Sequence, residues 1–242
     1  MRKTYIDDMG GERSVNIEFW LTYDGLLSST RGKAAKNQID SKWEHKHHVR
    51  QCFHDQLKNL WEQHPVLKRW LHGHPVWTEV FKSDSGGSLV DQRARQYPFN
   101  GFNFVPLVID GWAMVCSLEI VYLRQGAAGN LFENHDIDNR IKTLIDALKM
   151  PSVGELGEIY SDGSSVQPTR DQKPFFALLE NDSLVTKLTV DADTLLAPTG
   201  KVPESQNSAD SRVFIKVKCW SYDPGIETEI RRYRIIPEKD SS

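Results

Sequence analysis

The pattern of apolar and polar positions predicts strands and amphipathic helices along the first third of the chain. The stretch "SVNIEFWLTYDG", residues 14–25, alternates apolar with other residues, which is typical of a strand with one buried face. From 41 to 63 the apolar positions recur every three or four residues, which predicts a helix with Ser41 as its N-cap. A shorter helix, bounded by two prolines, is predicted in "HPVLKRWLHGHP".

The middle of the chain predicts a loop, a hairpin and a second amphipathic helix. Residues 82–103 are polar and glycine-bearing, so a long loop is expected there. Two β-rich runs in 104–126 are split at Asp110-Gly111, which is a hairpin signal. A helix is predicted to begin after Asp138, which is placed to cap it, and to end at Met150-Pro151. The apolar stripe of that helix contains Ile141, Leu144, Ile145 and Leu148.

The remaining third is expected to contain two loops and two further strands. Residues 151–173 read as a polar insertion, and "PFFALLENDSLVTKLTVD" gives an apolar stretch, a turn with Asp182 and an alternating strand. A loop over 196–210 precedes "SRVFIKVKCWSY", another alternating strand, and "IETEIRRYRIIP" is either a last strand or a basic tail. Strands and helices do not alternate strictly, which favours an α+β fold with a mixed sheet and packed helices, in one domain over 1–242.

Composition adds limits on location and partners. Apolar residues make up 39% of the 242 residues and the formal net charge is −3. No apolar run approaches the roughly 18 residues that span a membrane, and the N-terminus lacks an apolar signal core. The three cysteines are odd in number and far apart, which is typical of core thiols. A cytoplasmic protein is therefore expected.

One stretch departs from this acidic balance. Residues 31–50 carry six Lys/Arg against two acids, together with three of the eight histidines. They form either a solvated loop with an exposed helix face or an arm that contacts nucleic-acid phosphates. In the second case Arg31, Lys33 and Lys36 are the residues expected to bind the backbone of DNA.

The stretch "HDIDNRIKTLIDAL", residues 135–148, places two aspartates at the mouth of the predicted helix. Asp138 in an N-cap position would accept a backbone N–H bond, but this leaves the repulsion from Asp136 unexplained. In extended backbone the two side chains share a face, and a divalent cation such as Mg²⁺ would resolve their repulsion. Lys142, one turn on, either forms a helix salt bridge or supplies positive charge to a phosphate held by the ion.

A third acid is usual for a metal site that hydrolyses phosphodiesters. Asp182, at the start of a predicted strand, is one candidate. Spacing alone does not single it out among the 33 acids, which also include Glu133, Asp146 and Glu180.

These residues in order resemble the RusA family of Holliday junction resolvases. "DIDNRIKTLIDAL" followed by "LENDSLVTKLTV" is similar to the family's Asp-x-Asp-Asn, lysine, Asp-Ala-Leu, and later Asp with a following valine. The resemblance covers about residues 112–220. On this resemblance the metal-binding and catalytic acids are Asp136, Asp138 and Asp182, with Lys142 as the catalytic and phosphate-binding lysine. Asn139, Asp146, Ala147, Leu148 and Val185 match the remaining motif positions.

The resemblance implies a RusA-like fold with long loop insertions and a Mg²⁺-dependent homodimeric endonuclease that nicks branched DNA. Mn²⁺ is the alternative ion, and the long loops are candidate contacts for a partner protein. Two other functions stay open. One is a nuclease of this fold acting on other DNA or on RNA, in a phage or defence setting. The other is a non-catalytic nucleic-acid-binding or scaffold protein, which dispersed acids would favour.

Overall fold

The computed structural model describes six stretches of the chain, on which every statement below rests. They are residues 17–27, 41–72, 88–124, 136–152, 166–196 and 210–221. The expected N-cap at Ser41, the basic residues Arg31, Lys33 and Lys36, and the segment "IETEIRRYRIIP" lie outside the described residues or side chains. No helix within the described stretches is long and apolar enough to cross a membrane.

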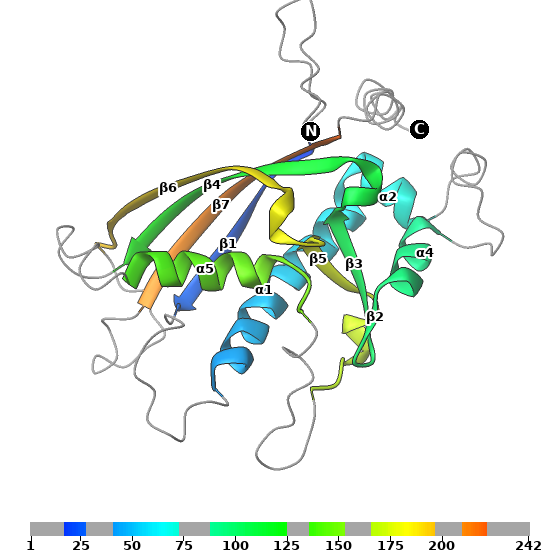
Figure 1. Cartoon of the computed structure of the whole chain (residues 1–242), viewed down its shortest axis with the longest axis horizontal. Helices are drawn as coiled ribbons and strands as arrows, with labels where there is room; N and C mark the ends of the chain where they lie inside the picture. Colours follow the sequence, from blue (N-terminus) through cyan, green and yellow to red (C-terminus); the bar gives the residue numbers. More distant parts are fainter. Residues whose placement is uncertain are drawn as a thin grey trace, which may run out of the picture.

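A four-stranded mixed sheet forms one half of the fold (Figure 1). In spatial order its strands are β1 (Ile17–Leu26), β7 (Asp210–Ser221), β4 (Met114–Arg124) and β6 (Val185–Thr194). β7 pairs antiparallel with both β1 and β4, whereas β4 and β6 are parallel. One side of β1, β7 and β4 is buried in the core, while β6 is only partly buried, and the α+β class with a mixed sheet is confirmed.

The second sheet shows that the predicted hairpin over 104–126 is wrong. Its strands, in order, are β2 (Pro98–Phe99), β3 (Phe102–Val108) and β5 (Phe175–Leu179), with β3 and β5 parallel. A 3₁₀ turn over Asp110–Trp112 leads the chain out of this sheet into β4. Tertiary contacts fix that turn, because Trp112 is buried beneath the Arg93 guanidinium and its carbonyl accepts a hydrogen bond from Ser221.

Four helices flank the sheets within the described stretches. They are α1 (Ser41–Gln63), α2 (Pro65–His72), α4 (Leu89–Gln96) and α5 (Asp136–Leu148). The predicted helix over 41–63 and the short helix in "HPVLKRWLHGHP" are confirmed. The helix predicted after Asp138 is also found, but it begins two residues earlier, at Asp136. The predicted long loop over 82–103 is wrong, because Ser88 and Asp91 form a capping box that starts α4 there. The helix is then held against the core by two buried apolar side chains, Leu89 and Val90.

The main core lies between the four-stranded sheet and the pair α1 and α5, which both cover the same face (Figure 1). α1 contributes Val49, Phe53 and Leu57, and α5 contributes Ile141, Leu144 and Leu148. The predicted core thiols Cys116 and Cys219 are buried, and Cys52 is half-buried. α5 thus runs beneath the sheet, with its beginning near the end of β4 and its end near the beginning of β4.

A second, smaller cluster is built from aromatic side chains. It joins Phe102, Phe104 and Phe175 with Val166 and Ala177. Val166 belongs to the predicted polar insertion over 151–173, so this end of the insertion packs against the body of the protein. Residues 153–165 of the insertion lie outside the described residues.

Candidate functional site

The acidic pair lies in the first turn of α5. The helix begins at Asp136, which makes Asp138 its third residue and not its N-cap, so the expected cap is wrong. Helical residues two apart point in directions about 200° apart, so a shared face from extended backbone is also not formed. Both positions nevertheless lie at the helix end whose dipole favours negative charge. The backbone of Asp136 is described and its side chain is not.

Asp138 is exposed, and its side chain makes no hydrogen bond or ion pair with any residue that the structure describes. Lys142, one turn further along the same side of α5, is exposed as well. The helix salt bridge that this spacing allows is not formed between them. The first turn therefore presents a carboxylate to solvent with no partner among the described residues and with a lysine nearby.

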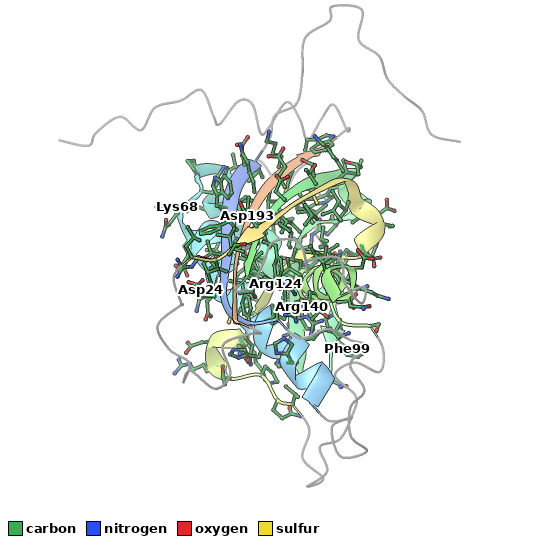
Figure 2. The ribbon with its side chains drawn as sticks, turned by 90° about the vertical axis from the view of Figure 1, so that its left-hand side faces the viewer. Asp24, Lys68, Phe99, Arg124, Arg140 and Asp193 are labelled. Carbon is green, nitrogen blue, oxygen red and sulfur yellow. The ribbon has the colours of Figure 1, made fainter. Side chains whose placement is uncertain are left out.

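The same end of α5 adjoins the ends of the sheet strands. Arg140 donates hydrogen bonds to the Leu27 carbonyl at 2.7 Å and to the Tyr122 hydroxyl at 3.4 Å. β4 ends at Arg124, which is paired in register with Ser211 of β7. Figure 2 shows Arg124 and Arg140 close together at this end of the sheet. Two arginines thus lie near the acidic turn. The sequence could have indicated Arg140, which follows Asp136 by one turn, but it contains no signal for Arg124.

The C-terminal end of α5 is neutralised by a network of ion pairs. The Lys149 Nζ lies 3.2 Å from Asp146 Oδ1 and 3.0 Å from Asp182 Oδ2. The Lys46 Nζ, from α1, lies 3.5 Å from the other oxygen of Asp146. The buried Arg50 donates to the backbone carbonyls of Asp146 and Lys149, at 2.9 and 3.2 Å. These two bonds satisfy carbonyls that a helix end otherwise leaves unpaired.

The ion pairs shift two pKa values in opposite directions. The hydrogen bond from Lys149 lowers the pKa of Asp182 below its ordinary value, and the more distant charge of Lys142 adds a smaller decrease. Partial burial lowers the pKa of Lys149, but its hydrogen bonds with Asp182 and Asp146 outweigh this and raise it. Asp182 therefore stays ionised, with a lysine as its partner.

Asp182 and Asp138 lie toward opposite ends of α5. Asp182 contacts Lys149, which follows Asp138 by eleven residues, or about 16 Å along a helix axis. Ligands of one Mg²⁺ lie about 2 Å from the ion, so they must be close neighbours. No group of three His, Cys, Asp or Glu side chains within the described stretches is close enough to hold a metal ion. Asp182 is thus paired with Lys149 at the C-terminal end of α5, whereas Asp138 lies in its first turn.

Of the basic stretch over 31–50, the structure describes residues 41–50. These residues are the first turns of α1, and two of their basic side chains, Lys46 and Arg50, hold the end of α5. His47 is buried and its ring packs against Phe102 and Phe175. Burial lowers the pKa of His47 to about 4, so it is uncharged at neutral pH. His47 and Arg50 are therefore buried within the fold and are not part of an exposed helix face.

Comparison of the chain with protein-family models, with curated proteins and with solved structures gives no match. The site is therefore interpreted from its own residues and from the resemblance of its motif.

Proposed function

We propose that this protein is a Mg²⁺-dependent endonuclease, similar to the RusA resolvases, that hydrolyses phosphodiesters in branched DNA during recombination or repair. The observation that carries the proposal is the exposed carboxylate of Asp138 in the first turn of α5, with no partner among the described residues. The C-terminal motif acid, Asp146, is by contrast engaged by two lysines, while Ala147 and Leu148 are buried. The motif thus divides into a structural half and a half available for chemistry.

The carboxylates at the N-terminal end of α5 are suitable ligands for a hard divalent cation, but Asp182 is not among them. Carboxylates are ligands that Mg²⁺ prefers, and one or two of them commonly suffice when water and phosphate complete the shell. We infer that Asp138 ligates the ion. The resemblance adds Asp136, which a regular first turn directs toward another side of α5. The contacts of Asp182 with Lys149 do not fit a third ligand from the same chain. When bound, the ion would polarise the scissile phosphate and lower the pKa of a water molecule.

The side chains around the acidic turn supply the remaining requirements for binding a phosphodiester. The exposed ammonium of Lys142 lies one helical turn from Asp138 and can offset negative charge on the phosphate as that charge increases. The guanidinium of Arg140 holds the end of β1 against α5 and so fixes the position of the first turn. In this proposal Lys142 binds substrate, and Arg140 positions the helix.

One observation favours a second candidate function. The distance between Asp182 and Asp138 along α5 is the arrangement expected for a non-catalytic nucleic-acid-binding or scaffold protein that kept the fold. In that case the exposed lysine would contact phosphate without hydrolysis, and divalent ions would not be needed. A nuclease acting on other DNA or on RNA differs from the first proposal only in its substrate.

We also propose that the protein is a homodimer. A four-way junction has two-fold symmetry, and two symmetric nicks need two opposed active sites, which a two-fold dimer supplies. This part of the proposal follows from the resemblance and from the symmetry of the substrate.

Incubating the protein with labelled junctions, flaps, duplexes, single-stranded DNA and RNA, with Mg²⁺, with Mn²⁺ and with EDTA, tests these functions. We expect paired nicks in junctions only when a divalent ion is present. Cleavage of another substrate would keep the nuclease and change its target. Binding without cleavage under every condition would favour the non-catalytic protein and overturn the enzyme.

A further inference from the structure

The two outer edges of the four-stranded sheet differ. At the β1 edge, the side chain of Gln56 in α1 accepts a hydrogen bond from the Thr22 backbone N–H at 2.9 Å and donates one to its carbonyl at 2.8 Å. A side-chain amide therefore occupies the place of a neighbouring strand. At the β6 edge, no strand pairs with residues 187–193 on the side away from β4, within the described part of the chain.

The β6 edge also leaves apolar surface uncovered. Leu188 pairs in register with the buried Leu118 of β4, so its side chain lies on the core face of the sheet. It is nevertheless 43% exposed, and it is one of the few large apolar side chains that the described surface exposes. Val190, two residues on, is half-buried on the same face. A long unpaired edge with exposed apolar residues is a place where another strand can add.

The sequence of β6 is complementary to itself when reversed. About Thr189 as centre, an antiparallel copy places Lys187 opposite Asp191 and Leu188 opposite Val190. Lys187 and Asp191 are both exposed on the open face, and Leu188 and Val190 share the core face. Two-fold symmetry forms each contact twice. Opposite charges and apolar side chains directly across an antiparallel pair stabilise it, whereas like charges destabilise it.

We propose that β6 pairs antiparallel with β6 of a second copy of this chain, about a two-fold axis at Thr189. The two four-stranded sheets then form one continuous sheet. The proposal names the surface of the homodimer proposed above and rests on that assembly for its role. The features that support this interface belong to the sheet edge alone. The oligomeric state tests it, and that measurement does not depend on nuclease activity.

Charge reversal tests both the surface and its register. Lys187→Asp places two aspartates opposite each other at two symmetric sites, and Asp191→Lys does the same with lysines. Each variant should raise the dimer dissociation constant roughly 10- to 30-fold, measured by sedimentation across a range of concentrations. An equal mixture of the two single variants should dimerise again, because the introduced aspartate of one copy then faces the introduced lysine of the other. The double variant K187D/D191K should also recover the dimer.

A matched control makes the same change on the same face away from the edge. Lys218→Asp on β7, two strands from β6, should leave the dissociation constant unchanged. Thr189→Cys adds a direct reading of register, because the two new thiols should form a disulfide between copies under mild oxidation, and Ala192→Cys should not. A wild-type protein that stays monomeric at high concentration would overturn the proposal. So would a dimer that neither charge reversal weakens, or one that the mixture of variants does not restore.

Discussion

The two ends of α5 carry similar side chains in different surroundings. At the C-terminal end, two acids and two lysines pair with one another, and Arg50 satisfies the terminal carbonyls. At the N-terminal end, Asp138 is exposed and has no partner among the described residues. Charges that neutralise each other contribute to folding, whereas a charge left without a partner is available to a ligand. The difference separates a structural half of the motif from a half that we assign to function.

The strongest test of this comparison changes the N-terminal end. Asp138→Asn removes charge but keeps the shape of the side chain. We expect junction cleavage in Mg²⁺ to fall by more than about 100-fold, since even residues that merely support metal ligands commonly cost 10- to 100-fold. The melting temperature should hardly change, because the side chain is exposed and without a described partner. Full cleavage by this variant would leave the proposed enzyme without its metal ligand.

The opposite pattern is expected where Arg50 meets the end of α5. Arg50→Met keeps much of the side-chain volume but leaves two carbonyls without their donor. The loss should lower the free energy of unfolding by roughly 2–3 kcal/mol, measured by urea denaturation, because the bonds are buried and charge-assisted. Cleavage measured well below the midpoint should stay near the wild-type rate. A stable variant with lost activity would assign Arg50 to the site and end the distinction between the two ends.

Asp146→Asn is the matched partner of Asp138→Asn, because the same chemical change is made two turns later on the same helix. Asp146 is 12% exposed and has two lysine partners, so we expect a loss of about 1–2 kcal/mol in the free energy of unfolding. Cleavage should be retained. If both variants abolished cleavage without unfolding the protein, the two ends would belong to one site.

The smallest expected effect concerns the titration of Asp182. Its folded-state pKa is lowered from 3.8, so its contribution to stability is complete above that value and is lost as the pH falls through the folded-state pKa. Lys149→Met should raise the pKa of Asp182, measured by NMR, because Lys149 is the largest cause of the decrease. Lys142→Met should raise it less. A larger effect of Lys142 would mean that Asp182 faces the N-terminal end of α5 in solution.

The sequence predicted the elements whose pattern is local. The periods of two and of three to four residues identify β1, α1, α5 and β7, because each of these has one face in the same core. The pattern failed over 82–103, where one capping box and two buried side chains suffice to form α4. It also failed at Asp110-Gly111, because turn residues do not specify which sheet the next strand joins.

For the candidate site too, the sequence predicted the local features and not the long-range contacts. The motif identified the first turn of α5 and the exposed Lys142, since both lie within a few residues of each other. The use of Lys46 and Arg50 by α5 was not predictable, because about a hundred residues separate these partners along the chain. The position of Asp182 at the far end of α5 follows from the parallel pairing of β4 with β6, which a single sequence does not specify.

The amide of Gln56 has a consequence for how the protein behaves when concentrated. A sheet with two open edges can add strands at both ends and grow without limit, which is one route to fibres. Gln56 occupies the backbone groups of Thr22 in the middle of the β1 edge, so a strand that added there would have to displace its amide. In the proposed dimer the β6 edge is taken by the partner copy. One glutamine on a helix therefore opposes strand addition at the β1 edge.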